Sequence, residues 1–327
     1  MATIQDVARL AGVSTATVSR VVNNRQLVSE KTAIKVERVI AELNYEPSVL
    51  GRNLRTSESR LLLVLIPSIG NPFYTEIIKG IEDAAIEQSY NILLCETGSD
   101  PKREDIYMNL VKNRMADGII SMDPAVNKPR LVELAKSHPI VQCSEYDKGG
   151  VISYVTIDSE LAAYEAVKYL LDLGHEKIGF INSDNKYLYA RDRYKGYEKA
   201  LKEFGLPINT DWIIYVERVG FEDGQRAMAK ILSNADLPTA IFADSDMLAV
   251  GAMKEIHKNG FHVPTDISLI GFDNIEFSTM SQPMLTTVSQ PMYQMGKESA
   301  MMLIHKIKGE PIENIVLAHE LLIREST

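Results

Sequence analysis

The sequence predicts a small all-α domain followed by a large α/β body made of two lobes with parallel sheets. Residues 1–45 contain only helical patterns, and after residue 60 strand-like apolar runs alternate with helical segments. Such alternation is typical of parallel sheets covered by helices on both faces. A chain of 327 residues exceeds one ordinary core. A body of about 265 residues favours two similar lobes over one.

The composition indicates a soluble protein of a reducing compartment. Hydrophobic residues make up 45% and charged residues 24% of the chain, as in globular proteins. Cys95 and Cys143 form no CxxC pair, so neither a disulfide framework nor a structural zinc site is expected. The sequence begins with no secretory signal and contains no apolar run of membrane-spanning length. We therefore expect a cytoplasmic protein without membrane contact.

The charge is divided unevenly along the chain. The formal net charge is −9, but residues 1–60 contain nine Lys or Arg and six Asp or Glu, which gives +3. Residues 61–327 must then carry −12. The sequence thus predicts a basic head on an acidic body.

The head begins with two short helices around a tight turn. Thr3 and Asp6 are spaced as a capping box at the start of the first helix. Gly12 permits the turn, and Ser14 is placed to cap the second helix. A third helix from Ser29 to about Asn44 completes a small core, giving a three-helix unit that contains a helix-turn-helix.

The outer face of the second helix favours contact with DNA. Its side chains are short except for one arginine, so the helix can approach base edges while the arginine makes a bidentate contact with guanine. The alternative is an ordinary helical cap, and the spacing alone leaves both interpretations open. The face consists of Thr15, Ala16, Ser19, Arg20 and Asn23.

A basic segment links the head to the body. Residues 46–60 include Leu54, an apolar side chain with no evident core, and Arg55. One interpretation is a flexible linker with Leu54 resting on its own protein. The other is a hinge that folds on DNA and inserts Leu54 into the minor groove.

The body contains nine apolar runs that we expect to be buried strands. It has no GxGxxG or GxxxxGK[ST] segment and no GxSxG or HExxH motif, so neither a nucleotide-phosphate site nor an enzyme is expected. No cofactor or metal is predicted. The runs are LLLVLIP, NILLCE, GIISMD, PIVQCSE, VISYVTID, KIGFIN, WIIYVE, TAIFAD and SLIGFD.

Segments along the whole chain resemble the LacI/GalR family of bacterial repressors. They include TIQDVARLAGVSTATVSRVVNN, NYEPSVLGRNLR, PFYTEIIKGIE, LGHEKIGFI, PTAIFADSDMLAVGAM, ISLIGFDN and LTTVSQP, in that order. The resemblance implies a lambda-repressor-like helix-turn-helix domain and a core like that of periplasmic binding proteins, with a small effector between its lobes. It also implies a homodimer on a near-palindromic operator in double-stranded DNA, at the nucleoid of a bacterial cytoplasm.

The resemblance assigns roles in the head and divides the chain. Thr15, Ala16 and Arg20 would read bases, Tyr45 would hold a phosphate, and Arg55 would sit in the minor groove. The chain would cross between lobes near Asp158, near Gln290 and once more near the C-terminus. The expected boundaries are 1–45 for the head, 46–60 for the hinge, 61–327 for the body, about 61–158 with 292–320 for lobe one, and about 159–289 for lobe two.

Effector contacts are expected after strand ends, because ligands of such sheets lie at the carboxyl ends of strands. Arg193 and Asp273 match positions that the family uses to hold the effector, and Val219 stands where relatives often have an aromatic stacker. Simple packing for Phe73, loop exposure for Glu145 and helix capping for Asp246 remain alternatives. The candidates are Phe73, Tyr74, Glu145, Tyr189, Arg193, Ser245, Asp246 and Asp273.

The candidate residues favour a neutral effector. Several carboxylates beside one arginine and aromatic rings suit hydroxyl groups or a heteroaromatic ring, and they would repel a phosphate. Within the family, the segment GRNLRTSESRLLLVLIP and the SEY stretch look most like cytidine repressors. This resemblance implies a nucleoside effector, with a sugar as the alternative.

Overall fold

In the computed structural model, the described residues are 2–45, 58–123 and 128–327. They belong to two compact units, Met1–Ser59 and Arg60–Thr327. Leu54 and Arg55, predicted to contact the minor groove, lie outside the described residues. No helix in the described ranges is long and apolar enough to span a membrane.

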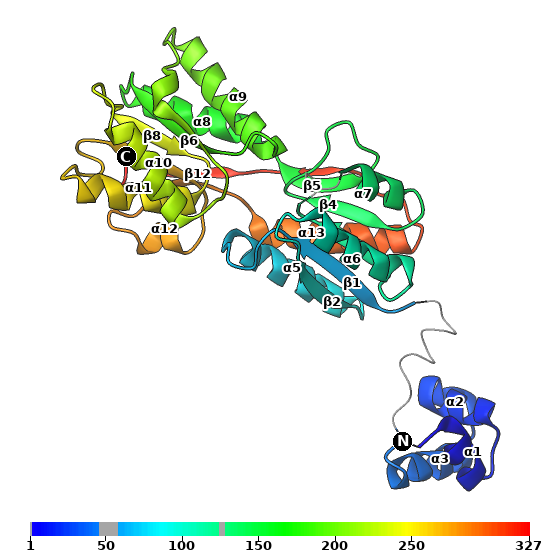
Figure 1. The fold of residues 1–327 in the computed structure, drawn as a ribbon. Helices are drawn as coiled ribbons and strands as arrows, with labels where there is room; N and C mark the ends of the chain where they lie inside the picture. The colour runs from blue at the N-terminus through cyan, green and yellow to red at the C-terminus, as the bar shows by residue number, and fades with distance from the viewer. Residues whose placement is uncertain (1, 46–57, 124–127) are drawn as a thin grey trace. The chain divides into compact units, whose positions relative to one another are not determined.

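The head is a three-helix unit whose helices begin where the capping residues predict. Thr3 and Asp6 form a reciprocal capping box at the start of α1, and Gly12 ends that helix with φ 60°. The Ser14 hydroxyl accepts a hydrogen bond from Thr17 N at 3.1 Å at the start of α2. The helices are α1 Ile4–Ala11, α2 Thr15–Asn23 and α3 Glu30–Glu42, with a 3₁₀ turn at Arg25–Leu27 (Figure 1).

The third helix differs from the prediction at both ends. Ser29 precedes it, but the Ser29 hydroxyl pairs with the Thr32 hydroxyl at 2.9 Å and makes no capping bond to a backbone N–H. The helix ends at Glu42, before the expected Asn44, because Asn44 has φ 43° and cannot continue it. The buried core of the head is Val7, Ala8, Ala11, Val18, Val21, Ala33, Val36 and Val39.

The body contains two six-stranded sheets with the same strand order, so the predicted α/β fold with two parallel-sheet lobes is confirmed (Figure 1). The order is β2-β1-β3-β4-β5-β11 in lobe one and β7-β6-β8-β9-β10-β12 in lobe two. All pairs are parallel except β10 with β12. Lobe one has β1 Leu61–Ile66, β2 Asn91–Glu96, β3 Gly118–Ser121, β4 Ile140–Cys143, β5 Ser153–Ile157 and β11 Ile315–Leu317. Lobe two has β6 Ile178–Ser183, β7 Ile213–Val216, β8 Ala240–Ala243, β9 Ser268–Asp273, β10 Thr286–Ser289 and β12 Glu320–Leu322.

Helices cover both faces of each sheet. Alternate residues of β1 show this, because Leu62 packs with α5 and α13 while Leu63 packs with α6 and α7 on the other face. Lobe one has α5 Phe73–Glu87, α6 Pro101–Lys112, α7 Lys128–Ala135 and α13 Met292–Ile307. Lobe two has α8 Ser159–Asp172, α9 Leu188–Glu203, α10 Phe221–Leu232, α11 Asp246–Lys258 and α12 Phe277–Met280, with a 3₁₀ turn at Thr210–Trp212.

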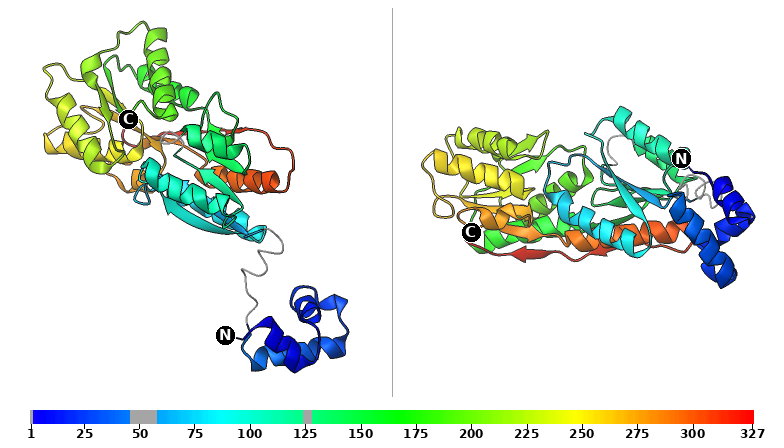
Figure 2. Two further views of the ribbon diagram at one scale, coloured as in Figure 1. Left: turned by 45° about the vertical axis from the view of Figure 1, so that its right-hand side comes forward. Right: turned by 90° about the horizontal axis from the view of Figure 1, so that it is seen from below.

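The chain passes between the lobes three times. The passages lie between β5 and α8 at Asp158, between β10 and α13 at residues 290–291, and between β11 and β12 at residues 318–319. As a result α13, which packs on α5 in lobe one, follows all of lobe two except β12 in the sequence (Figure 2). The same passages place the carboxyl ends of both sheets against each other.

Glycines set the closest helix contact of lobe one. A Cβ atom at Gly80 of α5 would lie 2.1 Å from the carbonyl oxygen of Tyr293, and one at Gly296 of α13 would lie 2.0 Å from that of Ile77. No real Cβ contact is that short, so these two helices approach as closely as they do because both positions lack a side chain.

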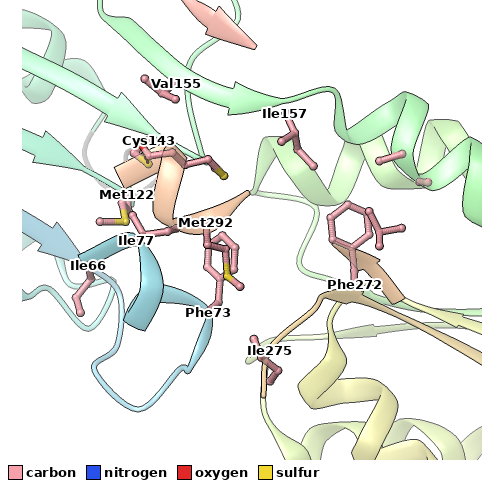
Figure 3. Close-up of a cluster of buried hydrophobic side chains, with 14 of the residues drawn as sticks. Ile66, Phe73, Ile77, Met122, Cys143, Val155, Ile157, Phe272, Ile275 and Met292 are labelled. Carbon is pink, nitrogen blue, oxygen red and sulfur yellow. Dashed lines mark hydrogen bonds between the residues drawn. The ribbon is translucent and has the colours of Figure 1, made fainter. Parts of the chain in front are cut away.

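A continuous apolar core reaches from lobe one into lobe two. Figure 3 shows Phe73 of α5 beside Met292 of α13, with Phe272 and Ile275 coming from the end of β9 in the other lobe. The labelled side chains of Figure 3 are all buried, including Phe73 of lobe one and Phe272 and Ile275 of lobe two. Residues directly after the strands on this side therefore stand at the junction of the two lobes.

Candidate functional site

The outer face of α2 presents the side chains predicted to contact DNA. Thr15, Ala16, Arg20 and Asn23 are exposed, and Ser19 is half-buried. Val18 and Val21, on the opposite face of the same helix, are buried in the core of the head. The 3.6-residue period of the helix thus separates a packing face from an outer face.

Two predicted DNA contacts are partly engaged within the head. The Asn23 amide donates hydrogen bonds to the Ser19 backbone oxygen at 2.6 Å and to the Ser19 hydroxyl at 3.3 Å. Tyr45 is half-buried against the core of the head, and its backbone N donates to Ile40 O at 2.9 Å. Both residues can reach DNA only with their remaining polar atoms.

A cavity of about 790 Å³ lies between the two lobes of the body. Residues from both lobes line it, among them seven of the eight candidates: Phe73, Tyr74, Glu145, Tyr189, Arg193, Ser245 and Asp273. The last candidate, Asp246, is not in the lining.

Arg193 lies at the centre of the lobe-two wall, although it is almost completely buried. It comes from the second turn of α9, where it donates a hydrogen bond to the carbonyl oxygen of Asp244. Its guanidinium carbon stands 3.5 Å from the ring centre of Phe272 and 4.8 Å from that of Tyr189. Cation–π contacts with these two rings hold the guanidinium in place and fix the direction of its N–H donors.

Asp273 ends β9 and faces Arg193 across the wall. Its Oδ1 accepts a hydrogen bond from Gln290 Nε2 at 2.7 Å and lies 4.0 Å from Arg193 Nη2. Burial raises the pKa of the Asp273 carboxyl well above its usual value, although Arg193 opposes the shift. The residue has φ 111°, a strained conformation that clusters at ligand sites.

Asp244 is a second buried carboxylate of this wall, and the sequence analysis missed it. Its Oδ2 accepts a hydrogen bond from Ser183 N at 2.8 Å, but its buried Oδ1 has no partner among the described residues. Burial raises the pKa of this carboxyl as well. Asp244 directly follows β8, so the strand-end rule that selected Ser245 would also have found it.

The structure corrects the prediction for Asp246. Its Oδ1 accepts a hydrogen bond from the Thr287 hydroxyl at 2.6 Å, and its Oδ2 accepts one from Ile275 N at 2.8 Å. The carboxylate is fully buried and fastens α11 to the chain after β9 and to β10. It does not cap the helix either, because Ser245 does so by accepting a bond from Leu248 N.

Glu145 lines the cavity, but its carboxylate is already engaged. Oε1 accepts a hydrogen bond from Leu188 N at 2.7 Å, and Oε2 accepts one from Tyr189 N at 3.2 Å. Glu145 follows β4 of lobe one, whereas both donors begin α9 of lobe two. The carboxylate thus joins the lobes.

Aromatic rings form the remaining part of the lining. Phe73 and Tyr74 of lobe one meet edge to face at 5.2 Å, while Tyr187 and Tyr189 of lobe two are stacked at 5.4 Å. Val219 also lines the cavity, and it provides no aromatic ring at the position where the resemblance predicted that an aromatic contact is missing. Tyr187, next to the predicted Tyr189, supplies an additional ring.

The cavity wall has an excess of negative side chains. It includes seven acidic residues and three basic ones, so its formal charge is −4 with every group ionised. Burial raises the pKa values of Glu145, Asp244 and Asp273, and protonation of any of them would reduce this excess, whereas each carboxylate that is ionised would repel a phosphate. The acidic residues are Glu96, Glu145, Asp184, Glu217, Asp223, Asp244 and Asp273, and the basic ones are Lys186, Arg193 and Arg218.

Comparison with known proteins decides the family. Residues 3–48 match the family described as bacterial regulatory proteins of the lacI family. Residues 59–325 match the periplasmic binding proteins and sugar binding domain of the LacI family. The chain belongs to the LacI family. This LacI-family protein is a DNA-binding transcriptional repressor, as its helix-turn-helix head and two-lobed core predicted.

Full-length relatives of this LacI-family chain are transcriptional regulators. A ribose operon repressor of Haemophilus influenzae is 36% identical, over 100% of this chain and 98% of that protein. The repressor CytR of Escherichia coli K12 is 35% identical, over 100% and 96%. Catabolite control protein A of Priestia megaterium is 38% identical, over 99% of each.

Solved structures show the same LacI-family architecture. The Lac repressor dimer bound to operator and the anti-inducer ONPF has a TM-score of 0.89 at 26% identity, covering 99% of this chain and 98% of that one. The regulator CelR in complex with cellobiose has a TM-score of 0.75 at 27% identity, covering 100% of both chains. Members of the family thus bind operators and small effectors and form dimers.

Proposed function

We propose that this LacI-family repressor responds to a neutral nucleoside bound in the cavity between its lobes. The observation that carries the proposal is the pairing of buried carboxylates with aromatic rings in one cavity. Asp244 Oδ1 is a buried acceptor without a partner in the described part of the chain, so a ligand hydroxyl or amino group would satisfy it. The rings of Tyr74 and Tyr187, from opposite lobes, line the same cavity and would contact a planar base bound there.

A sugar is the second candidate. The matched body family is described as periplasmic binding proteins and sugar binding domain, and one relative of similar identity is a ribose operon repressor. Hydroxyl groups of a sugar would find the same carboxylates, and one ring would stack on its apolar face. The two candidates differ in whether the aromatic part of the wall holds a base.

A thermal-shift screen separates the candidates. We expect cytidine or another nucleoside at 100 times its Kd to stabilise the full chain by about 2.7 kcal/mol, while the matching 5′-monophosphate binds more weakly. Stabilisation by ribose or cellobiose with none by nucleosides would leave the sugar. A monophosphate that binds more tightly than its nucleoside would contradict the inferred repulsion by the acidic wall.

On the DNA side, we propose that two copies of the chain place their heads on a near-palindromic operator in the bacterial nucleoid. Thr15, Ala16 and Arg20 would read bases, with Arg20 paired to guanine, and Ser19 would lie on the same DNA-facing side of α2. Asn23 and Tyr45 would contribute through the polar atoms that the head leaves free. Leu54 and Arg55 remain predicted minor-groove contacts.

Replacing Arg20 with alanine tests base reading. We expect the free energy of binding to the operator to weaken by about 1–3 kcal/mol, with nearly unchanged binding to unrelated DNA. Arg38 is the matched control, because it is an exposed arginine on α3 that pairs with Glu42. Electrophoretic mobility shifts at fixed salt measure both affinities. An equal loss on both DNAs would mean that Arg20 contacts only phosphate.

A further inference from the structure

Helix α9 of lobe two begins without a cap of its own. The residue before it is Tyr187, whose side chain makes no capping hydrogen bond, and its first turn contains no acidic residue. The first backbone N–H groups of a helix have no partner inside the helix and favour a negative charge nearby. The start of α9 therefore needs an acceptor from elsewhere.

Glu145 of lobe one supplies that acceptor. Its two carboxylate oxygens lie 2.7 Å from Leu188 N and 3.2 Å from Tyr189 N, the first two amides of α9. The side chain is buried, with 5% of the residue exposed. Helix caps are normally adjacent in sequence, whereas this one comes from 43 residues away and from the opposite lobe.

The contact lies beside two cavities. Glu145 lines the effector cavity, Leu188 lines a second cavity of about 360 Å³, and Tyr189 lines both. One turn further along α9, Asp192 forms an ion pair with Lys148 of lobe one, whose Nζ lies 2.8 Å from Asp192 Oδ2. The first turns of α9 thus bear three polar contacts across the lobes and present Tyr189 and Arg193 to the effector cavity.

We propose that Glu145 is an interlobe latch, a positioning residue that caps α9 only when the lobes are closed and so sets Tyr189 and Arg193 in the effector cavity. This inference rests on the proposed function only in taking the cavity as the effector site. Opening the lobes would remove the carboxylate from the α9 amides and leave both sides to water. An effector that closes the lobes would then work together with the latch.

Protonation of the Glu145 carboxyl makes the latch depend on pH. Burial raises the pKa of the Glu145 carboxyl to about 7, although the hydrogen bonds from Leu188 N and Tyr189 N lower it. Arg191 of α9 lowers this pKa, and Asp123 at the end of β3 raises it. The phenol groups of Tyr74 on α5 and of Tyr146 beside the latch also face this carboxylate.

The sign of the pH effect follows from the two states of the latch. With the lobes open, Glu145 is solvated and its pKa is about 4.3. Closure therefore takes up a proton, and this contribution to closure is fully present below pH 4.3 and is lost as the pH rises through about 7. Between pH 8 and pH 6 the closure equilibrium is expected to shift about tenfold toward the closed form.

Amide hydrogen exchange of the effector-free full chain tests the latch. In Glu145→Ala we expect the protection of the Leu188 and Tyr189 amides to fall about tenfold or more, since both acceptor oxygens are lost. In the wild type these protection factors should rise about tenfold from pH 8 to pH 6, and in Glu145→Gln that dependence should vanish. Glu160→Gln in the first turn of α8 is the matched control.

Two outcomes would overturn the latch. One is unchanged protection of residues 188–189 in Glu145→Ala, with the rest of the body as protected as in the wild type. The other is a pH dependence that survives in Glu145→Gln, which folds with nearly the same volume. Because no effector is present, failure of the nucleoside proposal in the thermal-shift screen leaves this result interpretable by itself.

Discussion

Replacing Asp273 with asparagine is expected to weaken effector binding by about ten- to a hundredfold, while operator binding without effector stays the same. A buried polar group that loses its hydrogen-bond partner costs about 1–3 kcal/mol, and the amide keeps the shape of the carboxyl but replaces one of its oxygens with an NH₂ donor. Asparagine can still accept the bond from Gln290 Nε2, so the wall of lobe two is expected to stay folded. Isothermal titration of the ligand found by thermal shift measures the loss.

The control for this experiment is Asp211→Asn. Asp211 is an exposed aspartate in the 3₁₀ turn before β7, and it does not line the cavity. Equal ligand affinity in Asp273→Asn and the wild type would remove Asp273 from the set of effector contacts. Loss of operator binding in the absence of ligand would instead show that Asp273 acts on the conformation of the body.

Replacing Gly296 with leucine is expected to lower the free energy of unfolding by about 3 kcal/mol and the Tm by about 6–12 °C. The new Cβ would stand 2.0 Å from the carbonyl oxygen of Ile77, so no rotamer relieves the overlap. Helices α5 and α13 must separate, which opens the core that Phe73 and Met292 share (Figure 3). Urea unfolding and calorimetry measure the change.

Gly149→Leu is the matched control, because nothing lies within 4 Å of a Cβ atom at that position. Its unfolding midpoint is expected to stay within the range of a surface substitution, about 0.5 kcal/mol. Equal midpoints for Gly296→Leu and Gly149→Leu would show that the α5–α13 contact can relax without loss of stability.

The strands of the body were predictable where they are apolar and central. All nine runs, from LLLVLIP to SLIGFD, contain strands of the structure, because buried parallel strands read as continuous apolar stretches. The last three strands gave no such pattern. β10 is the short segment TTVS, and β11 and β12 are three-residue edge strands that are half-buried or exposed.

The site was predictable in location but not in the use of each side chain. The rule that ligands meet strand ends brought seven of the eight candidates to one cavity. It could not tell that the Asp246 carboxylate turns away to bind Thr287 and Ile275 N. Nor could it show the bonds of Glu145, since their donors are 43 and 44 residues away in the other lobe.

The position of α13 has a consequence for synthesis on the ribosome. Its buried side chains complete the core of lobe one, yet the helix begins at Met292, after all of lobe two except β12 and the last residues of the chain has been translated. Domains tend to fold in the order in which they emerge, at about 5–20 residues per second. Lobe one must therefore wait, with the inner face of α5 uncovered, until most of its neighbour has been made. The two lobes should mature together, so a nascent chain stalled before residue 292 would expose the Phe73 surface to chaperones.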